Sequence, residues 1–179
     1  DTGMDCPAVS AGVWSEIQEA AETFYDRTEA CRLTTFVAYE YSGSPLVRNA
    51  HRNVIFRNKN VPALPTTYFD QSDVWGLWQR LQVECLDGDN GCDVLAIPHN
   101  SNWSNGAMFT PEYPGAESLE QEKERAEFRL RMEPIVEIFQ HKGDAECKNG
   151  LEAFMGGDEY CDFEKLRPVF DDCKDGVGF

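Results

Sequence analysis

The segment Asp93-Val94-Leu95-Ala96-Ile97-Pro98-His99 decides the fold expected for this chain. Its short apolar core predicts a strand over residues 93–97, because aliphatic and β-branched residues in succession favour extended structure. The strand ends at the proline and is followed directly by a histidine. Three further segments are predicted as strands: residues 33–39, 51–56 and 134–139.

Helical periodicity occurs before the first of these strands and between later ones. Apolar side chains recur at three- and four-residue spacing over residues 12–26 and 72–85, and paired acidic and basic side chains support a charged helix over residues 117–132. Strands that alternate with helices predict a single α/β domain over residues 1–179, with parallel strands and flanking helices. In such folds the chemistry gathers at the ends of the strands.

The charge of the chain narrows its range of partners. The 179 residues carry a formal net charge of −16, with 41% hydrophobic and 27% charged residues. An acidic protein of this kind repels phosphate backbones and anionic membrane surfaces, so nucleic-acid binding is not expected. No apolar run is long enough to span a bilayer. A solvated acidic surface without any partner explains the charge equally well.

The cysteine content points to an oxidising compartment. Seven cysteines without a CxxC pair predict two or three disulfides rather than a zinc knuckle, and hence a periplasmic or secreted protein. Cys85 and Cys92 flank an acidic, glycine-containing turn that brings two sulfurs within bonding distance. The odd number leaves one thiol free or bonded to a part outside this chain. The alternative is a reduced cytosolic protein with buried cysteines.

Three polar residues lie at strand ends in this arrangement. Glu40 and His99 each follow a predicted strand, and His51 opens another. A carboxylate and two imidazoles form a suitable site for zinc, iron or manganese. The alternatives are a strand-end salt bridge for Glu40 and structural roles for the histidines. No GxSxG or HExxH motif occurs, so serine and cysteine nucleophiles lack support from a motif.

Four segments resemble a known bacterial family, and they occur in the same order. They are Phe36-Val37-Ala38-Tyr39-Glu40-Tyr41-Ser42, His51-Arg52-Asn53-Val54-Ile55-Phe56-Arg57, Leu95-Ala96-Ile97-Pro98-His99-Asn100-Ser101-Asn102, and Glu133-Pro134-Ile135-Val136-Glu137-Ile138 followed by Gln140, Lys142 and Gly143. The family is the domain of unknown function 3604, which is similar to the polymerase-and-histidinol-phosphatase (PHP) superfamily of metal-dependent phosphoesterases.

The resemblance implies a PHP-like distorted (β/α) barrel with a cluster of divalent metal ions at the strand ends. Glu40 would be its bridging glutamate, and His51 and His99 would be two of its histidine ligands. The substrate implied is a small-molecule phosphate ester. Contacts with that substrate are expected, by proximity, from four residues: Asn100, Asn102, Gln140 and Lys142.

The sequence departs from the superfamily at both ends of the metal site. The HxH and Asp-x-His motifs are absent, since histidine occurs only at positions 51, 99 and 141. We therefore expect the chain to be the middle portion of a longer hydrolase, with an incomplete metal shell and no activity in isolation. The alternative hypothesis is a secreted, disulfide-stapled binding module without catalysis, whose ligand would contact Trp75, Trp78 and Trp103.

Overall fold

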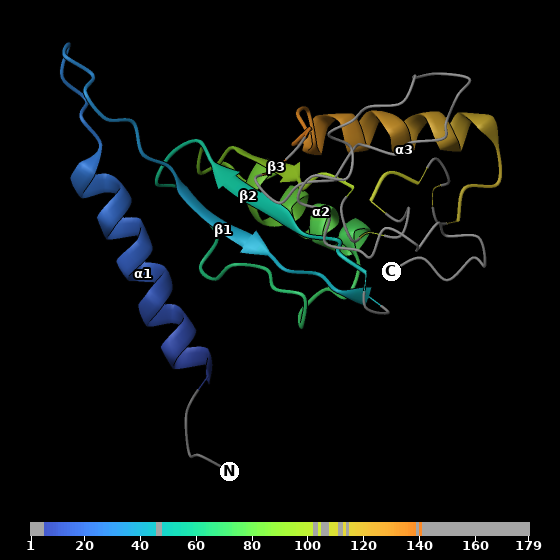
Figure 1. The fold of residues 1–179 in the computed structure, drawn as a ribbon, viewed down its shortest axis with the longest axis horizontal. Coiled ribbons are helices and arrows are strands. Elements are labelled where there is room, and N and C mark those ends of the chain that lie inside the picture. Colours follow the sequence, from blue (N-terminus) through green and yellow to red (C-terminus); the bar gives the residue numbers. More distant parts are fainter. Residues whose placement is uncertain are drawn as a thin grey trace, which may run out of the picture.

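A small sheet flanked by helices makes up the part of the molecule that the structure describes. The computed structural model describes residues 6–45, 48–101, 104, 108–110, 113, 115–138 and 140. Figure 1 shows the sheet at the centre, with α1 on the side of β1 and α3 on the opposite side. The elements follow the chain as α1 (Cys6–Phe24), β1 (Val37–Tyr41), β2 (Arg52–Phe56), α2 (Val74–Leu81), the π-helical turn η2 (Gln82–Leu86), β3 (Val94–Pro98) and α3 (Leu119–Met132).

The sheet is open and antiparallel, so the predicted parallel (β/α) barrel is wrong. Its strand order is β1-β2-β3, with Tyr41 opposite Arg52 and Arg52 opposite Pro98. The connection from β1 to β2, residues 42–51, is too short for a helical crossover, because parallel strands need about a dozen or more connecting residues. Without that crossover the chain turns back on itself and β2 pairs antiparallel with β1.

The antiparallel pairing still brings the ends of β1 and β3 to one edge. Both strands run antiparallel to β2, so they run in the same direction as each other. Tyr41 at the end of β1 and Pro98 at the end of β3 flank Arg52 at the start of β2. We call this edge of the sheet, where β1 and β3 end, the rim.

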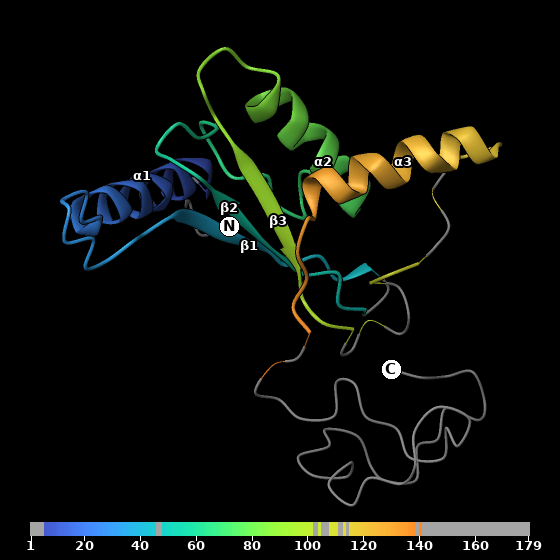
Figure 2. The same cartoon turned by 90° about the horizontal axis from the view of Figure 1, so that it is seen from above.

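One face of the sheet, the inner face, carries the core. Figure 2 shows the sheet crossing the middle of the molecule with α2 next to it. The indole of Trp14 in α1 packs edge-on against Tyr39 and Phe56 and donates a hydrogen bond to the carbonyl oxygen of Pro62 at 3.0 Å. The fully buried apolar side chains come from all three strands and the helices: Trp14, Val37, Tyr41, Val54, Phe56, Leu77, Leu81, Ala96 and Met132.

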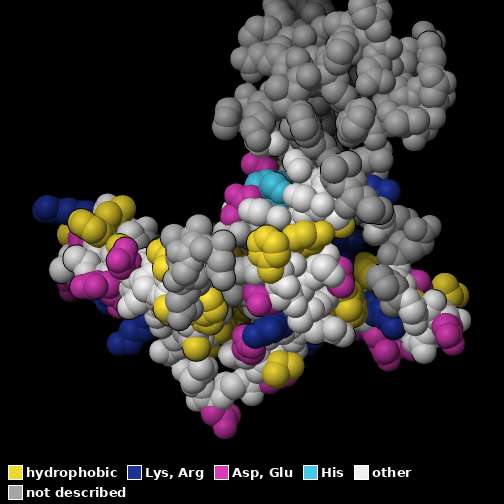
Figure 3. Space-filling view, turned by 90° about the horizontal axis from the view of Figure 1, so that it is seen from below, with side chains coloured by type: hydrophobic (Ala, Val, Ile, Leu, Met, Phe, Trp, Pro, Cys, Tyr) yellow, Lys and Arg dark blue, Asp and Glu magenta, His cyan; other side chains and the backbone are white. Residues whose placement is uncertain are grey.

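The opposite, outer face of the sheet is partly open to solvent. Side chains alternate between faces along a strand, so Ile55, Leu95 and Ile97 point away from the core. These three are only partly buried, and Phe36 just before β1 is 52% exposed. Figure 3 shows one face of the molecule, on which apolar side chains gather near a histidine and acidic side chains.

The predicted helices are confirmed, with shifted ends. The first begins at Cys6, and the second is capped by Asp73, whose carboxylate accepts a hydrogen bond from the Gly76 amide. Its last turn widens into η2. Within the described residues no helix combines the length and apolarity needed to cross a membrane.

The predicted fourth strand is wrong over residues 134–138. This segment lies beside the end of β3, where the Glu137 amide donates a hydrogen bond to the Pro98 carbonyl at 3.2 Å. The contact does not develop into a ladder, and residues 134–138 form no strand. Phe139 lies outside the described residues.

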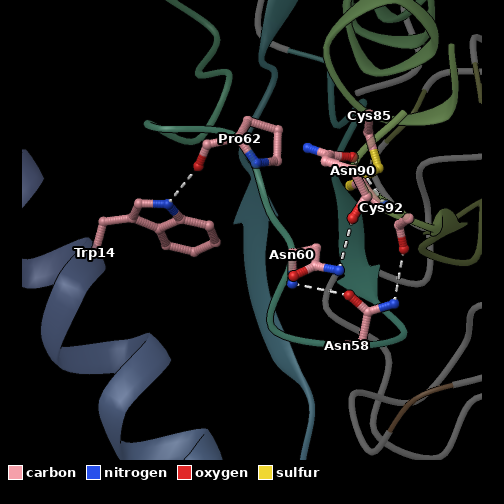
Figure 4. Close-up of a disulfide and its surroundings, with 8 residues drawn as sticks. Trp14, Asn58, Asn60, Pro62, Cys85, Asn90 and Cys92 are labelled. Atoms are coloured by element: carbon pink, nitrogen blue, oxygen red, sulfur yellow. Dashed lines mark hydrogen bonds between the residues drawn. A yellow bond between two sulfur atoms is a disulfide. The ribbon is translucent and has the colours of Figure 1, made fainter. Parts of the chain in front are cut away.

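The predicted Cys85–Cys92 disulfide is confirmed. It joins η2 to the start of β3 with a Cα–Cα distance of 5.0 Å. Figure 4 shows two asparagine side chains holding the same turn: Asn60 Nδ2 donates to the Asn90 carbonyl at 2.7 Å, and Asn58 Nδ2 donates to the Gly91 carbonyl at 3.0 Å. Cys31 is exposed and free. Further disulfides stay a prediction, because the other sulfurs lie outside the described part: Cys6, Cys147, Cys161 and Cys173.

Candidate metal centre

The rim brings together the three residues predicted as metal ligands. Glu40 lies near the end of β1, His51 directly precedes β2, and His99 directly follows β3. The His99 amide donates to the His51 carbonyl at 3.2 Å, which extends the β2–β3 ladder by one residue pair. By strand alternation all three side chains belong to the outer face. We call Glu40, His51 and His99 the rim cluster.

Glu40 and His51 form the closest pair in the rim cluster. His51 Nδ1 lies 3.0 Å from Glu40 Oε1, which also accepts a hydrogen bond from the Ser42 hydroxyl at 2.9 Å. A proton on Nδ1 in this bond leaves Nε2 as the nitrogen with a lone pair. No described residue donates a hydrogen bond to the second carboxylate oxygen of Glu40. The pair therefore presents one imidazole nitrogen and one carboxylate oxygen as possible metal ligands.

The two imidazoles stand edge-to-face. Their ring centroids are 5.6 Å apart with an interplanar angle of 68°. The side chain of His51 is 22% exposed and that of Glu40 is 44% exposed. The hydroxyl of Ser44 lies 3.3 Å from His51 Nε2. The site is thus partly open to solvent, and a hydroxyl occupies the neighbourhood of the imidazole nitrogen that a cation would use.

The rim cluster is not a closed metal site in this conformation. Among the described residues, no three His, Cys, Asp or Glu side chains are placed to hold one ion. Glu40 Oε1 is directed at His51 instead of at a point shared with His99. The two imidazoles and the carboxylate nevertheless suit a transition-metal ion, since both types of ligand occur at zinc, iron and manganese. Side-chain rotation and further ligands would be needed to complete the shell.

A buried ion pair lies directly behind the rim cluster. Arg52 Nε donates to Glu133 Oε1 at 2.8 Å, and Arg52 Nη1 donates to the Ala50 carbonyl at 2.7 Å. Both side chains of the pair are 3% exposed. Burial lowers the pKa of Arg52 from its ordinary value, while the carboxylate of Glu133 opposes that change. The pair ties the start of β2, and thereby His51, to the end of α3.

The structure describes two of the four residues that were predicted to contact the substrate. Asn100 is 1% exposed. Its backbone amide donates a hydrogen bond to Glu137 Oε2 at 3.0 Å, and its side-chain oxygen accepts one from Gln140 Nε2 at 3.1 Å. Asn100 and Gln140 therefore form one hydrogen-bond network beside the rim. The burial of Asn100 favours a structural role for its side chain over contact with a substrate. Asn102 and Lys142 lie outside the described residues.

Sequence reasoning missed four residues at this site: Ser44, Arg52, Glu133 and Glu137. One of them carried a detectable signal. In the predicted strand 51–56, Arg52 has the same parity as the apolar Val54 and Phe56, so a buried arginine in need of a carboxylate was implied. Nothing in the local sequence indicates that Glu133 is that carboxylate.

Fold and site together define a class of protein. Over the described residues, helices flank an open three-stranded antiparallel sheet, and two histidines and a glutamate lie at one edge of that sheet. The chain belongs to the family described as protein of unknown function DUF3604, whose family model matches residues 2–176. No curated protein and no solved structure matches it.

Proposed function

We propose that the chain supplies part of the metal centre of a metal-dependent hydrolase of the phosphoesterase kind. The observation that carries the proposal is the rim cluster, in which strand pairing places two imidazoles and a carboxylate from three separate segments at one edge of the sheet. The resemblance of the chain to the PHP superfamily supports the same chemistry.

The protein residues have distinct tasks in this proposal. His51 Nε2 and a nitrogen of His99 bind the cation, and Glu40 both orients His51 through Nδ1 and offers its second oxygen. A bound divalent cation supplies an acidified water and offsets the charge of a phosphate ester in an otherwise acidic protein. Three protein ligands, with water in the open positions, are enough to hold the cation in this chain alone. In this proposal the chain is the middle portion of a longer protein, which adds further ligands.

An extracytoplasmic location belongs to the same proposal. The Cys85–Cys92 disulfide supports it, because structural disulfides persist mainly in oxidising compartments. The net charge of −16 suits a protein that binds cations.

The test is metal content. The full chain is purified without chelator, incubated with zinc, manganese or iron(II), passed through a desalting column and analysed by inductively coupled plasma mass spectrometry. We expect a near-stoichiometric metal in the native chain, none in His99→Ala, and an unchanged content in Lys59→Ala, which removes an exposed side chain. Equal metal in native protein and His99→Ala, or none in either, overturns the proposal.

A ligand-binding module without catalysis is the second candidate. An aromatic cluster between α2 and α3 favours it: the ring centroids of Trp75 and Phe128 are 5.3 Å apart, and those of Trp75 and Trp78 are 5.6 Å apart. Trp75 and Phe128 border a shallow cleft of about 460 Å³. Trp103 lies outside the described residues. The metal measurement separates the two hypotheses, since this one expects no metal in the native chain.

A further inference from the structure

An apolar groove runs along the outer face of the sheet. Its volume is about 410 Å³, within the range of roughly 300–1,000 Å³ that is usual for small-molecule sites. Ile55, Leu95 and Ile97 from β2 and β3 line it, and Phe36 and Ile135 contribute from outside the strands. The groove is therefore concave, although the sheet beneath it is open.

Large apolar side chains of this groove contact water. Phe36 is 52% exposed and Ile135 is 54% exposed. A concave surface lined mainly by apolar side chains is suited to bind an apolar group of a ligand. Each methylene that moves from water into such a groove adds favourable free energy, because the apolar surface of both partners is removed from water.

The groove leads to the rim cluster. Along β3 the residues of the outer face are Leu95 and Ile97, and His99 continues the same alternation. On β1, Phe36 and Glu40 share that face in the same way. Successive positions of one face are roughly 7 Å apart, so the groove starts one such step from His99.

The end of the groove that lies away from the rim carries an ion pair. Arg57 and Asp93 line it and bind each other, with Arg57 Nη1 3.2 Å from Asp93 Oδ2. These two charges offset one another. Arg131 also lines the groove, and its guanidinium carbon lies 5.2 Å from the centre of the Phe128 ring. Most of the lining residues are apolar, so a ligand that fills the groove needs an apolar group there.

We infer that the substrate class is a phosphate ester of a long apolar alcohol, with the phosphate at the rim cluster and the alkyl group in the groove. The inference rests on the proposed function for its phosphate end. The apolar end of the ligand is inferred from the exposed apolar residues of the groove and from their continuity with His99.

Isothermal titration calorimetry with three probes tests the inference. Octyl phosphate, ethyl phosphate and 1-octanol, each below its aggregation limit, are titrated into the zinc-loaded chain, and 1-octanol also into the chain with chelator. We expect octyl phosphate to bind roughly tenfold or more tightly than ethyl phosphate. Ile135→Asp, outside every helix and strand, should remove most of that difference and leave ethyl phosphate unchanged. Leu95→Ala is a second, milder groove variant, and Val9→Asp on α1 is the matched control.

The outcomes separate the groove from the metal centre. Equal affinity for the two phosphates overturns the inference and leaves the proposed function intact. Binding of 1-octanol in chelator without binding of either phosphate keeps the groove but contradicts the phosphate end. A concentration-dependent dimer in analytical ultracentrifugation that Ile135→Asp abolishes also overturns the inference, because a second copy of the chain then covers the groove.

Discussion

Arg52 and Glu133 form an ion pair at 2.8 Å in which each side chain is 3% exposed. They lie 81 residues apart in the sequence, so the pair joins β2 to the end of α3. Buried pairs add little net stability when intact, because the charges lose their hydration, but removal of one partner leaves an unpaired charge in the core.

Replacement of one partner should therefore destabilise the fold strongly. Glu133→Ala is expected to lower the free energy of unfolding by roughly 3–5 kcal/mol, measured by urea denaturation. Arg52→Met combined with Glu133→Leu should recover most of that loss, because no charge stays buried. Asp93→Ala breaks the exposed Arg57–Asp93 pair and should cost less than about 1 kcal/mol. A cost for Glu133→Ala as small as that of Asp93→Ala would contradict the role assigned to the buried pair.

The disulfide should stabilise the chain by restricting its unfolded state. Cys85 and Cys92 are seven residues apart and both are buried. Closing so short a loop contributes roughly 2–3 kcal/mol in the chain-entropy model. We expect Cys85→Ser with Cys92→Ser to lower the melting temperature of the chain and to reduce the effect of reductant on it. Cys31→Ser, at an exposed free thiol, should change neither quantity. A melting temperature of the double variant equal to that of the native chain would refute this expectation.

Two glycines should respond to alanine in opposite ways. A Cβ at Gly43 would lie 2.6 Å from the ring of Tyr41, whereas a Cβ at Gly12 on α1 would meet nothing within 4 Å. Gly43→Ala should destabilise the chain by about 1–3 kcal/mol through overpacking. Gly12→Ala should stabilise it by about 0.5–1 kcal/mol, since alanine restricts the unfolded helix segment. Chemical denaturation measures both, and the same sign for the two substitutions would show that the loop between β1 and β2 packs differently.

Alkaline pH should destabilise the fold through its buried tyrosines. Burial, assisted by Asp73, raises the pKa of Tyr41 to about 12, and burial also raises the pKa of Tyr39. The folded state thus favours the neutral phenol. Its contribution is fully present below about pH 10, the ordinary tyrosine pKa, and is lost as the pH rises from there through about 12.

Tyr41→Phe isolates this effect. The Tyr41 hydroxyl donates to the Gln71 carbonyl at 2.7 Å, so the variant should lose about 1 kcal/mol at neutral pH. Its unfolding free energy should fall less steeply than that of the native chain between about pH 10 and 12. Urea titrations across this range measure both slopes. Parallel slopes would mean that Tyr41 ionises equally well in the folded and unfolded chain.

The rim cluster predicts a graded loss of metal affinity. His51→Ala should abolish zinc binding, because it removes a ligand. Glu40→Gln keeps the shape of the side chain but weakens the hydrogen bond to His51, and should weaken binding about 10–100-fold. Competition with a chromophoric chelator measures the dissociation constants. Native-like affinity in Glu40→Gln would exclude Glu40 both as a ligand and as the group that orients His51.

Local features of the fold could be predicted from the sequence. The helical periodicity of residues 12–26 and 117–132 depends on neighbouring residues only, and both helices are present. The Cys85–Cys92 pairing followed from the short turn between them. Sheet topology depends instead on which distant segments pair, and alternation of strands and helices does not settle that choice.

The proximity of Glu40, His51 and His99 could be predicted although the fold class could not, and their role as metal ligands stays a prediction. Glu40 lies near the end of β1 and His99 follows β3, and these strands run in the same direction in the parallel arrangement expected and in the antiparallel sheet observed. Both arrangements place their ends at one edge. The contact of Glu40 with His51 and the Arg52–Glu133 pair depend on side-chain packing and could not be foreseen.

The backbone hydrogen bond from His99 to His51 has a consequence for insertions and deletions in related chains. Because strand side chains alternate in direction, the loss or gain of one residue within β2 would turn Arg52 out of the core and Asn53 into it. The connection over residues 57–73 contains no strand, so changes of length there leave the register intact. Length variation among relatives should therefore concentrate in that connection and be rare between His51 and Phe56.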